Sequence, residues 1–128
     1  MGKLTLVTGV PGTRIQKSLA KFVEFAETNF DRTVEVHSLE ADFQTRARPQ
    51  VAEFHPEVGV SPTVIHTFLL PGALIRRLWS EAFESVTNRA HESRKKGDVI
   101  VTLHLSFFLH LTREYFFPAD LSLMIDWI

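Results

Sequence analysis

The stretch LTLVTGVPGTRIQKS, residues 4–18, decides the expected fold. Leu4 to Thr8 is a short run that is apolar on both faces, as in a strand buried inside a parallel sheet. Gly9-Val10-Pro11-Gly12 then ends it, because two glycines and a proline in four residues are typical of a tight turn. An amphipathic helix is predicted from about Thr13 to Asn29. Its expected apolar stripe consists of Ile15, Leu19, Phe22, Val23, Ala26 and Phe30.

The turn has the position of a phosphate-binding P-loop but not all of its residues. In the pattern G-x-x-x-x-G-K-[ST], backbone N–H groups surround the phosphates, the lysine reaches the β and γ phosphates, and the hydroxyl binds Mg²⁺. Gly9 fills the first glycine position, whereas Arg14 takes the second and Ile15-Gln16 replace the lysine and hydroxyl. Lys17-Ser18 come two residues late, which turns them by about 200° around a helix. Three alternatives follow: inserted residues return Lys17-Ser18 to the phosphate, Arg14 supplies the cation, or Gly9–Thr13 is a plain βα turn.

The rest of the chain continues the alternation of strands and helices. Further segments are predicted as a strand at Thr33–Leu39, a short helix with long loops across Ala41–Pro71, a helix at Gly72–Lys96 with Gly97 as its C-cap, a strand at Asp98–Phe108, a connector at Arg113–Asp120 and a last strand at Leu121–Ile128. Prolines punctuate the region from Ala41 to Pro71, which is why loops are expected there. Asp98–Phe108 is almost continuously apolar, and this favours a central position in the sheet.

This order predicts an α/β fold, a three-layer parallel sheet of P-loop type with about four strands, in a single domain over residues 1–128. Four strands are few for this architecture, and Trp127-Ile128 is an apolar finish. Either another chain covers the sheet edge, or the chain is a fragment and a C-terminal segment is missing.

The composition argues against several classes of protein. Fourteen basic and 15 acidic residues give a net charge of −1, without the basic excess expected for nucleic-acid binding. There is no cysteine, which excludes disulfides and thiolate catalysis. No apolar stretch reaches the ~18 residues of a membrane span, and no signal-peptide pattern begins the chain. A cytoplasmic protein with no membrane partner is therefore expected.

Three stretches together resemble a known family: KLTLVTGVPGT at residues 3–13, VIVTLHLSFF at 99–108 and YFFPADLSLMIDWI at 115–128. They look like the P-loop nucleoside monophosphate kinases, nearest in layout to archaeal-type adenylate kinases, with a degenerate Walker A motif. In that family a strand ending in V-T-G-x-P-G opens the chain, and a later strand has a D-T-H-like element, where Thr102 here replaces the acid. The resemblance implies ATP with Mg²⁺ in the crevice above Gly9, and a phosphate acceptor bound near the middle of the chain.

The candidate ligand-binding residues come from these patterns. Those expected to bind nucleotide are Gly9, Pro11, Gly12, Thr13, Arg14, Lys17 and Ser18. By the resemblance, Arg46 and Arg48 are candidate contacts to the acceptor phosphate; the alternative is an exposed charged loop. His104 lies near the carboxyl end of its strand, where ligands of open α/β sheets bind; the alternative is a hydrogen-bonded core histidine. No histidine spacing typical of a metal site is present, so no protein metal site is expected.

Two functions follow from the sequence. The first is purine nucleotide (ATP) binding by a diverged kinase-like domain. The alternative is a non-catalytic, degenerate P-loop domain that acts as an interaction or regulatory module. The altered Walker A residues and the missing acid at Thr102 argue against phosphoryl transfer, so no residue is assigned a catalytic role.

Overall fold

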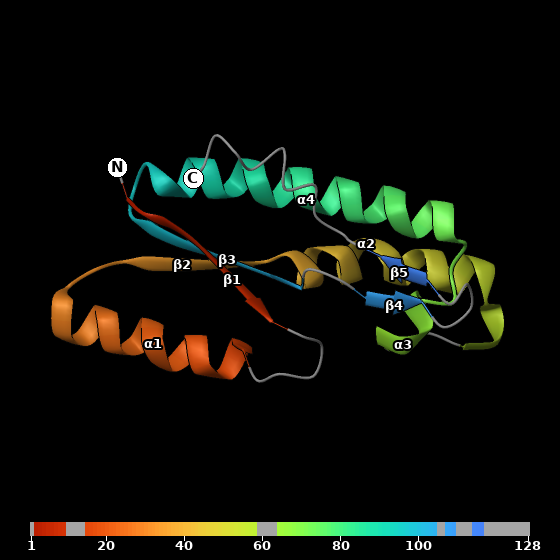
Figure 1. Cartoon of the computed structure of the whole chain (residues 1–128), viewed down its shortest axis with the longest axis horizontal. Coiled ribbons are helices and arrows are strands. Elements are labelled where there is room, and N and C mark those ends of the chain that lie inside the picture. Colours follow the sequence, from red (N-terminus) through yellow and green to blue (C-terminus); the bar gives the residue numbers. More distant parts are fainter. Residues whose placement is uncertain (1, 10–14, 59–63, 105–106, 110–113, 117–128) are drawn as a thin grey trace.

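Helices cover both faces of a three-stranded parallel sheet in this protein (Figure 1). The structure is a computed structural model, and it describes residues 2–9, 15–58, 64–104, 107–109 and 114–116. The strands are β1 (Leu4–Gly9), β2 (Val34–Ser38) and β3 (Asp98–His104), and their order in the sheet is β1-β3-β2. The prediction that the third strand is central is therefore confirmed. The α/β class is confirmed as well, and the described residues form three of the about four strands expected.

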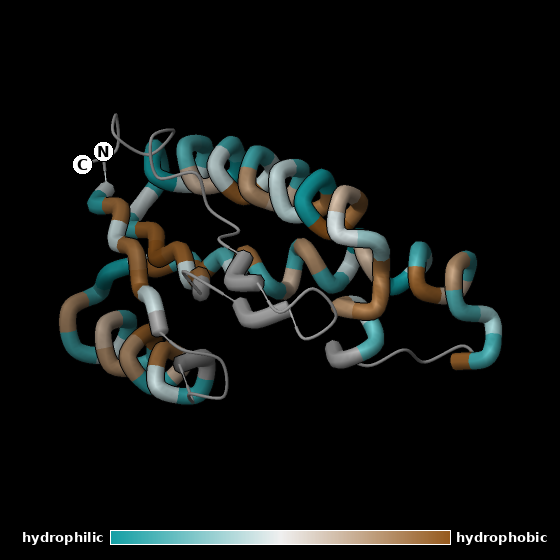
Figure 2. Tube along the Cα trace, turned by 45° about the vertical axis from the view of Figure 1, so that its right-hand side comes forward, coloured by the Kyte–Doolittle hydropathy of each residue, from teal (hydrophilic) through white to brown (hydrophobic). Residues whose placement is uncertain are grey.

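The strands form where their residues are apolar on both faces. Val99, Val101 and Leu103 of β3 are buried on one face, and Ile100 is buried on the other. In Figure 2 the strands of the sheet are mostly brown, whereas the helices alternate brown and teal. This is the pattern of a sheet between two helical layers, because such a sheet buries both of its faces.

One helix covers one face of the sheet, and two cover the other (Figure 1). α1 (Ile15–Phe30) follows β1, while α2 (Leu39–Phe54) and α4 (Gly72–Arg94) lie on the opposite face. The larger core joins α2, α4 and the sheet. Its largest fully buried side chains include Trp79, Phe43, Leu39, Ile75 and Leu103. Phe43 stacks in parallel on Trp79, with ring centroids 3.9 Å apart.

The α1 side has a smaller core than its sequence predicts. Among the described side chains, Ala26, Val34 and Ile100 are buried there, with Leu19 and Val23 of the expected stripe half-buried against them. Phe22 and Phe30, placed on the buried stripe by their spacing, are 53% and 64% exposed. That part of the prediction is wrong for the described structure, because the sheet beneath α1 is too narrow to cover the whole stripe.

The short helix with long loops expected after β2 is in fact a 16-residue helix, α2. Ser38 caps it: its Oγ accepts a hydrogen bond from the Ala41 amide at 3.2 Å. Its buried face consists of Leu39, Phe43, Ala47 and Val51, each four residues after the last. Pro49 lies inside the helix on an exposed position. The packing of the buried face outweighs the local penalty of a proline. The short helices η1 (Pro56–Val58) and α3 (Val64–Thr67) follow.

The end of the chain also differs from the prediction. β3 ends at His104, and residues 107–108 belong to β4 (Phe107–Leu109), which pairs antiparallel with β5 (Glu114–Phe116). The expected connector at Arg113–Asp120 therefore includes a strand. The expected last strand, Leu121–Ile128, lies outside the described residues.

Two turns next to the sheet depend on unusual backbone positions. α1 ends at Phe30, and Asp31 follows with a φ of 49°, in the left-handed region. α4 ends at Arg94, and its C-cap residue is Lys95 and not the predicted Gly97, although the Gly97 amide donates a 3.2 Å hydrogen bond to the Ser93 carbonyl. A Cβ on Gly97 would lie 3.0 Å from the Thr33 carbonyl oxygen. Gly97 thus permits the close approach of two backbones at the amino end of the sheet.

Candidate functional site

The carboxyl ends of the three parallel strands meet at one edge of the sheet. Gly9 at the end of β1 is in register with His104 at the end of β3, and Ser38 at the end of β2 is in register with Thr102. The strand order thus brings together the backbones of two candidate residues, Gly9 and His104, that are far apart in sequence. Ligands of open α/β sheets bind at this edge.

The segment that would form the phosphate loop follows β1 at this edge. β1 ends at Gly9 and α1 begins at Ile15. The candidates Pro11, Gly12, Thr13 and Arg14 lie outside the described residues. Because α1 is continuous from Ile15, any inserted residues that would return Lys17 to a phosphate must lie within 10–14.

Lys17 and Ser18 lie in the first turn of α1, and both are exposed. The first turn of a helix has unpaired N–H groups and a partial positive charge, which favour a nearby anion. Ile15 begins the helix at the position that the P-loop pattern gives to its lysine. Lys17 follows two residues later, about 200° further around the helix than Ile15.

Arg46 and Arg48 lie on α2 and not in a loop, so the alternative of an exposed charged loop is wrong. The Arg46 Nε donates a hydrogen bond of 2.6 Å to Asp42 Oδ1, and its Nη1 lies 3.8 Å from Glu81 Oε2 on α4. The hydrogen bond to Asp42 raises the pKa of Arg46 above its usual value. Asp42 also accepts a 2.6 Å hydrogen bond from Arg89 of α4. Arg46 is thus engaged in an ion-pair network between two helices.

Arg48, in contrast, is exposed on α2. Leu39 is the first residue of α2 and directly follows β2. At about 1.5 Å per residue, Arg48 therefore lies roughly 14 Å along the helix axis from the end of β2. The Arg48 guanidinium is available to a ligand, whereas Arg46 would first have to give up its ion pair with Asp42.

Thr102 takes the position of the acid expected in β3, and it is 2% exposed. A buried hydroxyl there supplies no carboxylate to a magnesium ion. Among the described residues, no group of three or more His, Asp or Glu side chains could hold a metal ion. The described part of the site therefore does not fit a protein-bound Mg²⁺.

A second polar cluster, at His37, has the residue types of a hydrolase but not the geometry. The His37 Nε2 lies 3.3 Å from Ser93 Oγ and 3.4 Å from Glu35 Oε2. A serine–histidine–acid triad needs the serine and the acid on different ring nitrogens. Here both contact the same nitrogen, so this cluster is a structural link between β2 and α4.

Sequence reasoning missed one ionic contact at the opposite edge of the sheet. Asp98, predicted only as the start of its strand, accepts a 2.9 Å hydrogen bond from the Lys3 amide and a 3.1 Å hydrogen bond from Arg32. The Lys3 amide, together with Arg32, lowers the pKa of Asp98. Because this contact joins residues 95 apart in sequence, no local pattern could have indicated it.

Comparisons with known proteins add no family to this picture. No protein-family model matches the chain, and no curated protein matches it. None of the described helices is both long and apolar enough to cross a membrane. The interpretation of the site therefore depends on the chain's own residues.

Proposed function

We propose that this domain binds the phosphate groups of a purine nucleotide, with ATP as the expected ligand, at the carboxyl edge of β1 and β3. One observation supports this above the others: Gly9 ends a parallel strand beside the end of β3, and a helix begins six positions later, at Ile15. A glycine-bearing turn between such a strand and helix can present several backbone N–H groups to one anion.

In this proposal Gly9, Gly12 and Thr13 supply the backbone of the phosphate loop. Either Arg14 or Lys17 supplies the cation, and Ser18 adds a hydroxyl. His104 contributes from the neighbouring strand end. Arg48 is the stronger candidate for an acceptor phosphate, because Arg46 already pairs with Asp42 and Glu81.

The proposed activity is binding and includes no phosphoryl-transfer step. Transfer needs cations that neutralise the charge developing on the phosphoryl group, and a carboxylate commonly holds the metal. The buried Thr102 cannot take that role. Any Mg²⁺ at this site would be held by the nucleotide's own phosphates.

A thermal-shift titration of the chain with ATP, with and without Mg²⁺, tests the proposal. A ligand present at 100 times its Kd stabilises the native state by about 2.7 kcal/mol, which corresponds to roughly 10 °C for a domain of this size. Arg14→Ala abolishes the shift if Arg14 is the cation, and Lys17→Ala abolishes it if inserted residues return Lys17 to the phosphate. Lys21→Ala is the matched control, since Lys21 is an exposed lysine one turn further along α1. No shift at millimolar ATP would overturn the proposal.

The alternative is a non-catalytic interaction module. The observation that favours it is the exposure of Phe22, Phe25 and Phe30 on α1, at 53%, 55% and 64%. Exposed aromatic clusters often mark contact surfaces. The two functions differ in the titration above, because an interaction module without a ligand-binding loop gives no ATP-dependent shift.

A further inference from the structure

A groove lies between α1 and β1, on the face of the sheet that α1 covers. Its volume is about 460 Å³, within the range of roughly 300–1,000 Å³ that is typical of small-molecule sites. Lys3, Thr5 and Val7 line it together, because alternate side chains along an extended strand share one face. The groove therefore has the sheet as its floor and α1 as one wall.

The wall that α1 contributes is aromatic. Phe22, Phe25 and Phe30 line it, and each of these side chains is more than half exposed. The rings of Phe25 and Phe30 also meet edge to face, with their centroids 5.7 Å apart. On the floor of the groove, Val7 is half-buried and Ile100 is buried. An apolar group held here would remove the surface of these rings from water, which favours its binding.

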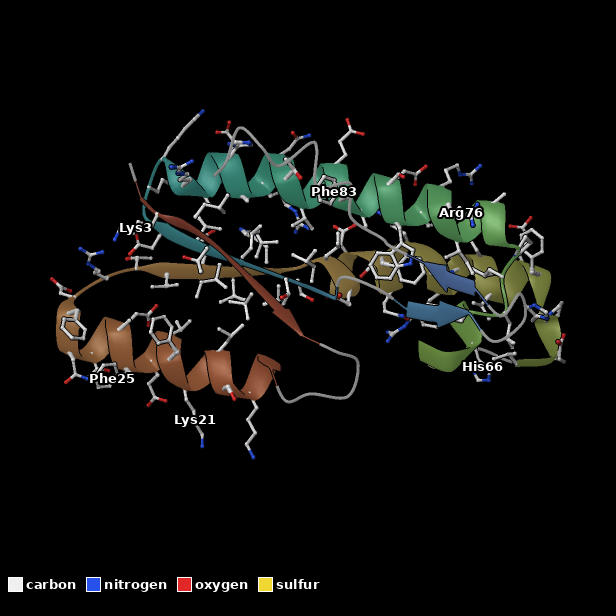
Figure 3. All side chains as sticks on the ribbon, in the orientation of Figure 1. Lys3, Lys21, Phe25, His66, Arg76 and Phe83 are labelled. Carbon is white, nitrogen blue, oxygen red and sulfur yellow. The ribbon has the colours of Figure 1, made fainter. Side chains whose placement is uncertain are left out.

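The charged side chains of the groove lie at one end of it. Of the described residues that line it, the charged ones are Lys3, Arg32 and Asp98. Lys3 precedes β1, Arg32 precedes β2 and Asp98 begins β3. All three are therefore at the amino end of the parallel sheet, and Figure 3 shows Lys3 and Phe25 at the same end of the molecule. The groove is thus apolar along its length and ionic at one end.

This ionic end has two cations and one carboxylate. The Oδ1 atom of Asp98 accepts a 2.9 Å hydrogen bond from the Lys3 amide, and its Oδ2 atom lies 3.1 Å from Arg32 Nη1. The contact from Lys3 uses its backbone, so the ammonium group is a positive charge in excess of the Arg32–Asp98 pair. Because a guanidinium has five N–H donors, Arg32 can contact a second carboxylate while it keeps Asp98.

We propose that this groove binds a monocarboxylate with a hydrocarbon chain, which is the chemistry of a fatty acid. The carboxylate lies between Lys3 and Arg32, and the chain runs along the phenylalanines of α1. An apolar groove with a few polar groups that fix the orientation of the ligand is the usual form of a small-molecule site. A monocarboxylate also supplies the one negative charge that balances this end, whereas a phosphate monoester would bring nearly two.

The groove is long enough for an extended chain. Residues 3–7 span about 13 Å as a strand, and the helical wall from Leu19 to Phe30 spans roughly 16 Å. The proposed site is also separate from the phosphate loop, because that loop follows the carboxyl end of β1 and Lys3 precedes its amino end. Carboxylate binding therefore goes beyond nucleotide binding, and it is tested without a nucleotide.

Isothermal titration of the full chain with dodecanoate, well below its micelle concentration, tests the proposal. We expect saturable binding at a single site, with a Kd on the order of 0.1 mM or tighter. Dodecyltrimethylammonium has the same chain with a cationic head. It should bind on the order of tenfold more weakly or less, because Lys3 and Arg32 would repel its head.

Two kinds of variant locate the ligand in the groove. Lys3→Glu should raise the Kd for dodecanoate on the order of tenfold, because it replaces an attraction by a repulsion. Lys21→Glu is the matched control, since Lys21 is exposed on α1 and points away from the sheet (Figure 3). Phe22→Ala and Phe25→Ala should each raise the Kd by a similar factor through the loss of apolar contact. Their control is Phe54→Ala, an equally exposed phenylalanine at the end of α2.

The phenylalanine and lysine variants change exposed side chains, so circular dichroism should show the same fold as in the unaltered chain. Three results would overturn the proposal. The first is no saturable binding by the unaltered chain up to about 1 mM dodecanoate, which would show that the groove is covered by something else. The second is equal or tighter binding of dodecyltrimethylammonium. The third is an affinity that Lys3→Glu leaves unchanged, or that Phe54→Ala weakens as much as Phe22→Ala and Phe25→Ala do.

Discussion

Pro49→Ala is expected to stabilise the protein, because Pro49 lies inside α2 and has no amide hydrogen. The carbonyl of Thr45, four residues earlier, therefore loses the helical hydrogen bond that any other residue at position 49 would donate, and the proline ring crowds the same carbonyl. Pro49 is exposed, so its replacement disturbs no core packing.

The expected gain is large for a surface position. Proline is about 3 kcal/mol less favourable than alanine inside a helix. We expect about 2–3 kcal/mol here, since the helix around Pro49 has already adapted to the missing hydrogen bond. A domain of this size changes its Tm by about 4 °C per kcal/mol, which gives a rise of roughly 8–12 °C.

Urea denaturation followed by circular dichroism measures this directly, through a higher midpoint at an unchanged m-value. Glu53→Ala is the control, because Glu53 is exposed on the same helix, and its effect should stay within about 0.5 kcal/mol. An unchanged or lower stability of Pro49→Ala would show that the helix does not continue through residue 49, and the assignment of α2 would then be wrong.

Three further predictions concern the core, a turn and an ionic contact. Phe43→Ala should cost about 3–5 kcal/mol of unfolding free energy in the same assay, because Phe43 is fully buried and stacks on Trp79; a cost under about 1 kcal/mol would contradict this packing. Asp31→Val should lower the unfolding free energy by about 1–2 kcal/mol relative to Asp31→Gly, because position 31 is in the left-handed region; equal stabilities of the two variants would contradict that backbone conformation. The pKa of Asp98 is lowered from its usual 3.8, first by the Lys3 amide, so its contribution to stability is complete above that value and is lost as the pH falls through the lower folded pKa. Denaturation at a series of pH values should therefore show a shallower acid loss of stability for Asp98→Asn than for the unaltered chain, and parallel curves would argue against this contact.

The strands and two of the helices could be predicted because each has a local pattern. The bounds of β1, β2, α1 and α4 differ from the predicted bounds by at most two residues, and β3 ends four residues earlier than predicted. For the region of α2 the sequence predicts only a short helix, because its prolines favour loops, whereas the structure follows the spacing of Leu39, Phe43, Ala47 and Val51. That spacing is a four-residue period that predicts a helix face. A proline lowers helix propensity locally, but the burial of a whole helix face outweighs one such penalty.

The site was less predictable because its geometry depends on pairings between distant segments. The register of Gly9 with His104 follows from the strand order, which no local pattern specifies. Arg46 could not be recognised as an ion-paired residue, because its partner Glu81 lies on α4 and the sequence predicts only a short helix in the region of α2. The exposure of Phe22 depends on how wide a sheet lies beneath α1.

The central claim is that the turn after β1 holds the phosphates of a nucleotide, and an isothermal titration of the chain with ATP tests it most directly. The account predicts saturable binding at a single site, weakened by Arg14→Ala or by Lys17→Ala and unaffected by Lys21→Ala. Inorganic triphosphate should compete with ATP, because the loop is expected to contact the phosphates. Two results would contradict the claim. The first is no heat of binding at millimolar ATP at two temperatures. The second is binding that triphosphate does not displace and that neither Arg14→Ala nor Lys17→Ala weakens.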